Sequence, residues 1–426
     1  MSTAAAGATA TSAGAMAVAA PTAKADRYLI MDVLRGFALF GVMLINLTEL
    51  GGETILITTL QLAALPAAKL DEATLLWVNL LVYDKANTLF AVLFGLGFWV
   101  QMQRLEARGA PFVAIYLRRI TILLLIGLAH LLFLFAWDIL HVYAIAALIL
   151  FLCRKLPDRS LLLLGLGLLL FGKPLLTWAF AAIGISGPLD AIWTAESATL
   201  ARQAAAQSGS LTAFTGAMRE MLYFEWLVNG GLIAWVSYAL GRFFLGAWIG
   251  SKGWIQKADA NRPAFRLWLW PLLLGGFLLE SAYQFGGDAV SGSVFEAVLP
   301  ILHAVATPLI AAGYVCALVV LFQSQWLSWL AKPFAPVGQM ALTNYLLQSV
   351  AIILILTSWG PGLGLAGKAG ASTFLPFVVI FFGVQMVFSH LWLRAFAYGP
   401  VEWMWRALTY GTSPPLRRNI AREMQA

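Results

Sequence analysis

The chain has 426 residues, of which 61% are apolar and 11% charged, whereas a soluble domain is about 45–50% apolar and about 25% charged. One water-soluble core cannot bury so large an apolar share, which excludes a soluble globular enzyme, a disordered chain and a nucleic-acid-binding domain. A helix that crosses a bilayer needs about 20 apolar residues, so the composition predicts an all-α, polytopic membrane protein. The net charge of +7 must be interpreted by position, because loop charge orients membrane helices.

Apolar runs predict about ten transmembrane helices in chain order. We expect a flexible N-terminal tail at 1–26, a single transmembrane domain at 27–411 and a basic cytoplasmic tail at 412–426. Two long external loops are expected at 48–86 and 184–223, and the Ala-rich stretch in the second loop predicts a helix outside the bilayer over 195–208. The expected spans are 29–47, 87–103, 119–137, 139–153, 160–183, 224–248, 266–280, 296–322, 337–358 and 374–396.

The distribution of basic residues tests this order of spans. Twenty of the 27 Lys and Arg residues fall in segments on the side of the N-terminus, five fall on the opposite side, and two lie within spans. The five on the opposite side include Lys85, and Arg242 is counted among the twenty. Because Lys and Arg concentrate on the cytoplasmic side of membrane proteins, both termini are predicted to be cytoplasmic.

Polar residues on the first span form a stripe. Asp32 and Arg35 are three residues apart and share a helix face, and Asn46 lies about 20° from Arg35 after three turns at 100° per residue. Ionisable groups inside a span are costly and often functional, so the stripe predicts the lining of a substrate path. The competing interpretation is a structural ion pair at the cytoplasmic interface, with Arg35 extending toward water.

The third and fourth spans carry the sharpest candidate for catalysis. His130 lies about 16 Å from Arg119 along a helix, and Asp138 lies at the tight turn that follows. A neutral imidazole at this depth can accept a proton, and a carboxylate can fix its tautomer. We therefore predict His130 as a general base oriented by Asp138. Alternatively, Asp138 caps the next helix with His141 beside it, and His130 is a packing residue.

Further candidates lie in the last third of the chain. His303 stands between two prolines of the eighth span, and Asn344, Tyr345 and Gln348 open the ninth. Asn344 and Gln348 face the same way, and two amides facing lipid would be expensive, so they must face a partner helix or a cavity.

After the last span, Glu402 and Arg406 form an i,i+4 pair flanked by tryptophans. This segment predicts either an amphipathic helix anchored at the cytoplasmic interface or a cap over a cytoplasmic ligand entrance.

Motifs of other chemistries are missing from the sequence. It has no Walker A loop, no GxGxxG motif at a strand–helix turn, no CxxC and no HExxH. Four scattered histidines without an acidic cluster argue against a metal site. We expect no metal and no tightly bound cofactor.

Several segments together resemble the YeiB-like family of bacterial inner-membrane proteins (domain of unknown function 418). The resemblance covers about residues 27–411, and its last motif is long and specific. The segments that carry it run from Arg27 through Asp32 and Arg35 to Asn46, from Leu89 to Gly97, from Arg118 through His130 and Asp138 to Ala144, from Ala341 through Asn344 to Ser349, and from Tyr398 through Glu402 and Arg406 to Gly411.

That family is similar to a wider group of transmembrane acyltransferases, which includes heparan-α-glucosaminide N-acetyltransferase. The resemblance implies a multi-pass protein of the inner (cytoplasmic) membrane that moves an acyl group from cytoplasmic acyl-CoA to a glycan or lipid acceptor outside. His130 matches the histidine of the family and Asp138 its acidic partner. The partners expected are the lipid bilayer, acyl-CoA as co-substrate and the acceptor, with a homodimer as a further prediction and no nucleic acid.

Two other functions stay open. A small-molecule or lipid transporter or exporter would use the same polar stripe and the proline-bent helices as a substrate or proton path, and it would leave its substrate chemically unchanged. A structural or signalling scaffold would tolerate alanine at His130 or Asn344 with no effect beyond stability.

Overall fold

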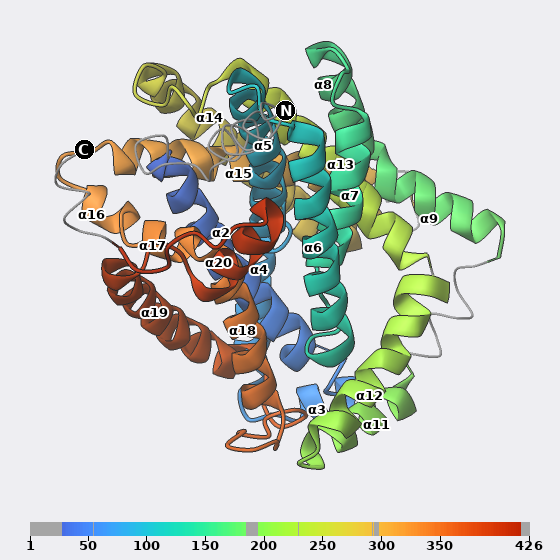
Figure 1. Cartoon of the computed structure of the whole chain (residues 1–426). Helices are drawn as coiled ribbons and strands as arrows, with labels where there is room; N and C mark the ends of the chain where they lie inside the picture. Colours follow the sequence, from blue (N-terminus) through green and yellow to red (C-terminus); the bar gives the residue numbers. More distant parts are fainter. Residues whose placement is uncertain are drawn as a thin grey trace, which may run out of the picture.

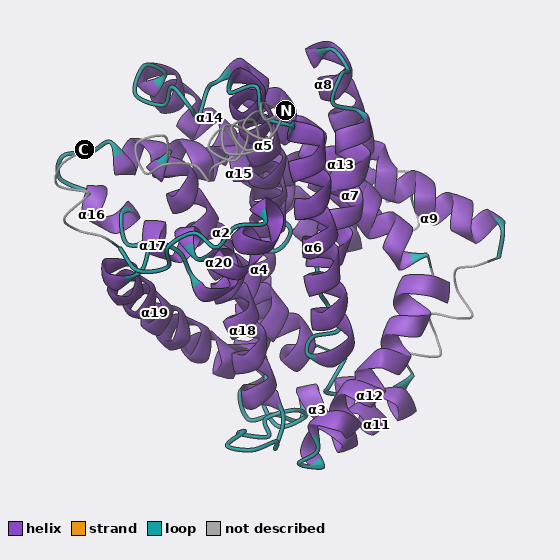
Figure 2. Ribbon diagram, viewed as in Figure 1, coloured by secondary structure: helices purple, strands orange, loops and turns teal. Residues whose placement is uncertain are grey.

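The structure is a computed structural model that describes residues 28–53, 55–184, 195–228, 230–291, 293 and 298–418. The predicted tail at 1–26 and the end of the predicted tail at 412–426 lie outside the described residues. Within the described ranges every regular element is a helix, and the β contact there is an isolated bridge between Phe396 and Arg417. Figure 2 shows the resulting all-helical bundle, which confirms the predicted fold class.

Six helical segments within the described residues are long and apolar enough to cross a membrane, which supports the membrane assignment. A seventh is added if the bent pair Ser328–Gln339 and Ala341–Leu356, whose halves meet at 87°, counts as one span. The ten spans predicted are therefore not confirmed, partly because helix α7 (Leu140–Leu152) has only 13 residues. The six are Leu29–Gly52 (α2), Ala68–Ala107, Phe112–Phe133 (α6), Gly231–Lys252 (α13), Leu299–Phe322 (α15) and Ala371–Ala395 (α19).

Helix α2 occupies the centre of the bundle, and most of its side chains are buried. It packs against the short helix α17 (Phe334–Gln339), helix α18 (Ala341–Leu356) and α19 (Figure 1). A Cβ at Gly36 would overlap the Phe334 carbonyl, and one at Gly338 would overlap the Asp32 carbonyl. Glycine at both positions therefore brings the two backbones into direct contact, next to the break between α17 and α18.

The predicted external loop at 48–86 is mostly helical. Helix α2 continues to Gly52, and α3 (Thr59–Ala63) and α4 (Ala68–Leu81) follow. Helix α4 leads almost directly into α5 (Lys85–Ala107) through Asp84, which has a left-handed backbone with φ of 60°. The apolar residues 75–83 therefore belong to helix α4 and the junction that follows it, rather than to an irregular loop.

The second external loop contains the predicted helix. Helix α11 (Glu196–Gln207) matches the prediction for 195–208 and packs against α12 (Leu211–Leu222). Both lie at the end of the molecule opposite α8 (Asp158–Gly167) and the first described residues (Figure 1). Helix α8 continues through the π-helix Leu168–Gly172 into α9 (Lys173–Ala182).

Helix α14 (Arg262–Val290) packs along α15 as an antiparallel pair, in which α15 lies against α5 and α14 contacts α4. Large apolar side chains on the outer face of α14, including Leu274 and Leu278, are more than three-fifths exposed. The outer face of α19 is similar, with Ile380 67% and Val387 60% exposed. In a bilayer these faces contact lipid, because a membrane helix does not have to bury its apolar side chains in protein.

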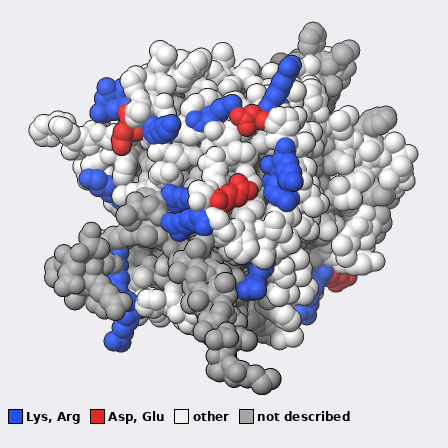
Figure 3. Space-filling model, turned by 45° about the horizontal axis from the view of Figure 1, so that its top comes forward, with Lys and Arg blue, Asp and Glu red and all other residues white. Residues whose placement is uncertain are grey.

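The last helix, α20 (Pro400–Tyr410), is amphipathic and packs against α6 and α18. The face that comes forward when the top of Figure 1 is tilted toward the viewer shows more Lys and Arg than Asp and Glu (Figure 3). In Figure 1 the first described residues lie in the upper part of the bundle and α20 lies near its middle.

The contact between α5 and α13 provides a test of the packing. A Cβ at Gly246 would overlap the Val92 carbonyl, so Gly246→Leu must push the two helices apart. We expect it to destabilise the protein by about 1–3 kcal/mol or more, as overpacking does. Gly275→Leu on α14 is the control, because no heavy atom lies within 4 Å of its Cβ position. Unfolding followed by tryptophan fluorescence in detergent measures both, and equal stability of the two variants would contradict the assignment.

Candidate functional site

A narrow cavity of about 290 Å³ runs between α2, α5, α6 and the start of α18. Its lining on α5 extends from Arg108 at one end to Asn87 at the other, which is about 30 Å of helix at 1.5 Å per residue. Helix α20 contributes Glu402, Trp405, Arg406 and Tyr410 at the same end as Arg108. The cavity therefore extends from the end of α5 that carries Arg108 deep into the bundle.

Arginines dominate the mouth of this cavity. Two acids lie among them, and one of these, Asp32, pairs with Arg35 at 3.2 Å, as the spacing of the first span predicts. The Arg119 guanidinium lies 3.9 Å from the centre of the Trp405 ring, a cation–π contact that holds it in place. The excess of positive charge suits a ligand with several anionic groups, since guanidinium binds phosphate and carboxylate through paired hydrogen bonds. The arginines that line the cavity are Arg35, Arg104, Arg108, Arg119 and Arg406.

Glu402 ties α20 to the broken helix at the cavity mouth. Its carboxylate accepts hydrogen bonds from the backbone N–H groups of Leu342 at 2.7 Å and Thr343 at 3.0 Å, and from the Thr343 hydroxyl at 2.6 Å. These are otherwise unpaired donors at the start of α18, where a carboxylate is favourable. The interaction partner of Glu402 is thus the start of α18, and Arg406 one turn later lines the cavity.

The inner part of the cavity is apolar and aromatic. Phe90, Phe94 and Leu39 line its walls, and Ile139, Leu140, Tyr143 and Tyr345 lie at its inner end. A charged mouth and an apolar interior together fit an amphipathic ligand with an anionic head and an acyl or similar tail.

The predicted catalytic pair lies immediately behind this inner end. His130 Nδ1 is 2.8 Å from Asp138 Oδ1, and the His130 ring centre is 5.3 Å from that of Tyr345. Asp138 Oδ2 contacts His141 Nδ1 at 2.8 Å and accepts a hydrogen bond from the His141 backbone N–H at 2.9 Å. His130 and His141 are 4% exposed and Asp138 is fully buried. Asp138 therefore contacts both histidines and also accepts from the first turn of α7, so the contacts expected from both interpretations are present, and the catalytic role stays a prediction.

The hydrogen bonds define the tautomer of His130. An ionised carboxylate only accepts hydrogen bonds, so Nδ1 of His130 carries the proton and Nε2 keeps its lone pair. In this tautomer the Ser349 hydroxyl, 2.9 Å from Nε2, donates to the imidazole rather than to the Tyr345 carbonyl at 3.4 Å. His130 is thus held in the form that accepts a proton at Nε2, with Asp138 in place to stabilise the resulting imidazolium.

Ser349 is a functional candidate that the sequence analysis did not single out. It is 1% exposed, and with His130 and Asp138 it completes a Ser–His–Asp arrangement. Its position four residues after Tyr345 was an available signal, because the two share one face of α18.

Gly127 allows this site to form. A Cβ there would come within 3.0 Å of the Asp138 carboxylate and overlap the His141 backbone. Glycine therefore lets the turn before α7 lie directly on α6.

Asn344 and Gln348 face a partner helix, one of the two surroundings that the sequence predicts for them. The Asn344 amide donates to Ser389 Oγ at 2.9 Å, and the Gln348 amide donates to Gln385 Oε1 at 3.0 Å. Both partners lie on α19, so these amides hold α18 against α19. Within the described part of the chain neither residue lines the cavity, and neither does the half-buried Asn46.

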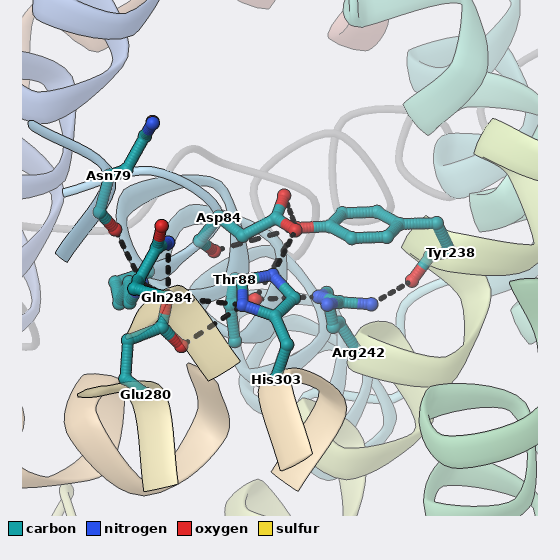
Figure 4. Close-up of polar contacts among 9 residues, drawn as sticks. Asn79, Asp84, Thr88, Tyr238, Arg242, Glu280, Gln284 and His303 are labelled. Carbon is teal, nitrogen blue, oxygen red and sulfur yellow. Dashed lines mark hydrogen bonds and ion pairs between the residues drawn. The ribbon is translucent and has the colours of Figure 1, made fainter. Parts of the chain in front are cut away.

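His303 lies in a second polar cluster, separate from the cavity (Figure 4). Its Nε2 is 3.0 Å from Asp84 Oδ2, and its Nδ1 is 3.0 Å from Glu280 Oε2. Lys85 Nζ is 2.7 Å from Glu280 Oε1, and both side chains are completely buried. The predicted position of Lys85 in an external loop is therefore wrong, because the carboxylate of Glu280 compensates its charge inside the bundle.

The same cluster contains Arg242, which the sequence analysis counted among the basic residues on the cytoplasmic side. Arg242 lies within α13, where its Nε donates to the Thr88 hydroxyl at 2.7 Å and its guanidinium carbon lies 3.3 Å from the Tyr238 ring centre. Tyr238 in turn donates to Asp84 Oδ1 at 3.0 Å. Arg242 is 5% exposed, so its charge belongs to the polar cluster rather than to a loop.

Comparison with known proteins places the chain in a family. The family described as "Protein of unknown function (DUF418)" matches residues 249–412. The uncharacterized protein YxaH of Bacillus subtilis (strain 168) is 30% identical over 417 residues, which cover 93% of this chain and 98% of the relative. The uncharacterized protein YeiB of Escherichia coli (strain K12) is 30% identical over 401 residues, which cover 92% and 98%. No solved structure matches the chain. Because these matches extend over nearly the whole length of both relatives, the chain belongs to the YeiB-like DUF418 family of bacterial proteins.

Proposed function

We propose that the protein is a membrane-embedded acyltransferase that takes an acyl group from cytoplasmic acyl-CoA and delivers it to an extracytoplasmic acceptor. The observation that carries the proposal is the cavity, whose arginine-lined mouth and apolar interior end beside Tyr345, directly in front of the pair of His130 and Asp138. The five arginines bind the phosphates of the donor. The acyl chain follows the apolar wall inward.

The topology that this reaction needs is part of the proposal. Ten spans with both termini in the cytoplasm put the arginine-lined mouth on the cytoplasmic side of the inner membrane, and they put His130 toward the outer half. A helix accompanies each predicted span, although several of these helices are short or interrupted. The basic face seen in Figure 3 supports this orientation through the positive-inside rule.

The chemical step requires one base and one acceptor. Nε2 of His130 takes the proton of an acceptor hydroxyl or amine, whose oxygen or nitrogen forms the new bond to the acyl carbon. The bond from that carbon to the sulfur of CoA breaks, and the imidazolium returns the proton to the leaving thiolate. For this step the Tyr345 side chain moves aside, and the acceptor replaces the Ser349 hydroxyl at Nε2. A glycan or lipid acceptor and a homodimer stay predictions.

Transport is the second candidate function, and one observation favours it. The break of 87° between α17 and α18 lies beside the cavity, which Gly338, Gln339 and Ala341 help to line. Broken helices form the substrate sites of many transporters. The fate of the substrate separates the two functions, because transport into vesicles leaves it chemically unchanged while transfer releases free CoA.

Loss of the base tests the acyltransferase proposal. Reconstituted protein is incubated with labelled acetyl-CoA and envelope glycans, and acylated product and free thiol are measured. We expect His130→Ala to lower the rate by about 10²–10⁴-fold, the usual contribution of a general base. His390→Ala is the control, because His390 is an exposed histidine at the end of α19. The proposal fails if the wild-type protein transfers no acyl group and hydrolyses no CoA thioester.

The arginine-lined mouth makes a separate prediction about donor binding. In Arg104→Gln combined with Arg108→Gln, we expect the KM for acyl-CoA to rise at least about tenfold with kcat little changed, because charged hydrogen bonds to the donor are lost. Lys155→Gln combined with Arg159→Gln removes the same charge from exposed positions beyond the cavity. Equal KM values for the two double variants would show that the cavity mouth does not bind the donor.

Ser349 distinguishes direct transfer from a two-step route. Direct transfer needs only the lone pair of His130, so Ser349→Ala should retain the rate within about tenfold. A loss as large as that in His130→Ala, together with an acyl group found on Ser349 of the wild-type protein by mass spectrometry, would instead assign Ser349 as a nucleophile that carries the acyl group.

A further inference from the structure

The polar cluster around His303 collects ionisable side chains from four elements. Asp84 comes from the junction before α5, Lys85 from α5 itself, Arg242 and Tyr238 from α13, Glu280 and Tyr283 from α14, and His303 from α15. Figure 4 shows the side chains of Glu280 and His303 converging, with Asp84 at the other side of the His303 ring and Thr88 and Arg242 beside it. None of these residues has a part in the acyl-transfer step proposed above.

Proton counting separates this cluster from an ordinary ion pair. Both ring nitrogens of His303 face carboxylate oxygens, Nδ1 facing Glu280 and Nε2 facing Asp84, each at 3.0 Å. A neutral imidazole has one N–H and one lone pair, and an ionised carboxylate can only accept. With a neutral His303 and two ionised carboxylates, one of these contacts would bring two lone pairs together. Two hydrogen bonds therefore require one additional proton, on the imidazole or on a carboxyl group.

We propose that Asp84, His303 and Glu280 form a proton-binding site in the part of the bundle distant from the arginine-lined mouth. The site holds one proton more than the sum of two carboxylates and a neutral imidazole. With this proton on His303, the cluster holds three positive charges, on His303, Lys85 and Arg242. The two carboxylates balance two of them.

The exposed fractions of the side chains distinguish the two ends of the site, and the proposed topology gives the side from which a proton enters. The side chains of His303 and Asp84 are 17% and 15% exposed, whereas Lys85 and Glu280 are completely buried. The exposed end of the site lies at the junction of α4 and α5. In the ten-span topology this junction faces outward, so protons enter from the outside and Glu280 is the inner limit of the site.

The neighbours of the trio favour a proton over a metal ion. The Lys85 ammonium lies 2.7 Å from Glu280, where a metal would be repelled, and both His303 nitrogens are already occupied by hydrogen bonds. Within the described part of the chain, no group of His, Cys, Asp and Glu has an arrangement that would hold a metal. Other described groups that face the trio include Tyr238, which donates to Asp84, Gln284, whose amide donates to Glu280 at 3.3 Å, and Tyr283, whose ring centre is 4.8 Å from that of His303.

Release of the proton has a structural consequence. His303 would lose one of its two hydrogen bonds, of which the bond to Asp84 joins α15 to the start of α5 and the bond to Glu280 lies within the α14–α15 pair. Because a buried lone-pair contact is costly, loss of the bond to Asp84 is expected to loosen α15 from α5, while the Lys85–Glu280 pair still holds α14 there.

Asp84→Asn is the sharpest variant for a test. Asparagine tolerates the left-handed backbone of this position, and the ion pair of Lys85 with Glu280 is unchanged. An amide can donate to Nε2, so a neutral His303 then satisfies both contacts without the additional proton. Asp158→Asn is the control of equal charge, because Asp158 pairs with Lys252 at an exposed site on α8.

The measurement is nitrogen NMR of protein labelled at its four histidines, in lipid nanodiscs, with His303→Gln to assign the signal. In the wild-type protein and Asp158→Asn we expect both ring nitrogens of His303 to be protonated at pH 7.5, above the usual titration range of histidine near pH 6.5. In Asp84→Asn we expect a neutral His303 at pH 7.5, with proton affinity at least about tenfold lower. An infrared band of a protonated carboxyl group that disappears in Asp84→Asn would support the site equally.

Thermal unfolding gives a second readout. The folded protein binds the proton more tightly than the unfolded chain, so its stability must fall as the pH rises through the point of release. This fall should be smaller in Asp84→Asn than in Asp158→Asn. The proposal is overturned if wild-type His303 carries a single proton at pH 7.5 with no protonated carboxyl group, or if Asp84→Asn leaves the protonation of the trio unchanged. Neither result depends on acyl transfer.

Discussion

The cost of removing charge from water governs the arrangement of this protein. A buried ion without a partner is penalised by several kcal/mol, and the bilayer offers no water as a substitute. Each buried carboxylate described above accordingly has a dedicated set of donors. Asp138 accepts from two imidazoles, Glu280 from Lys85 and His303, and Glu402 from the start of α18. The contacts of Glu280 and Glu402 join helices far apart in the sequence, so these carboxylates both compensate charge and determine which helices pack together.

Helix α5 separates two polar regions with different properties. Asn87 and Phe90 on one face line the cavity, while Lys85 and Thr88 on the other face enter the His303 cluster. The close contact of α5 with α13, which glycine permits at Gly246, keeps Arg242 within reach of Thr88. A displacement of α5 at the His303 cluster would therefore also displace the cavity wall, because the residues of both regions lie within about two turns of this helix.

The sequence predicts a polar site when its partners are near in the chain. His130 and Asp138 are eight residues apart across one turn, and Asp32 and Arg35 share a helix face, so spacing alone indicated both pairs. Lys85 and Glu280 are separated by nearly half of the chain, so spacing gives no sign that they pair. The charge of Lys85 therefore led to the prediction that it lies in a loop. Ser349 was missed for the same reason, since its partner lies on α6. The membrane fold followed from composition, whereas the number of spans depends on breaks such as that between α17 and α18, which apolar runs do not reveal.

The two central histidines differ in what surrounds them, and this difference divides their chemistry. His130 has a carboxylate on one nitrogen and a hydroxyl on the other, so its neutral form satisfies both contacts and retains a lone pair for a substrate proton. His303 has carboxylates on both nitrogens, so only a form with one more proton satisfies both. The first arrangement suits a base whose Nε2 is unprotonated before the substrate binds. The second suits a site that already holds its additional proton. In the proposed reaction, removal of the acceptor's proton is assigned to His130, and in the proposed proton-binding site His303 holds a proton until a rise in pH releases it.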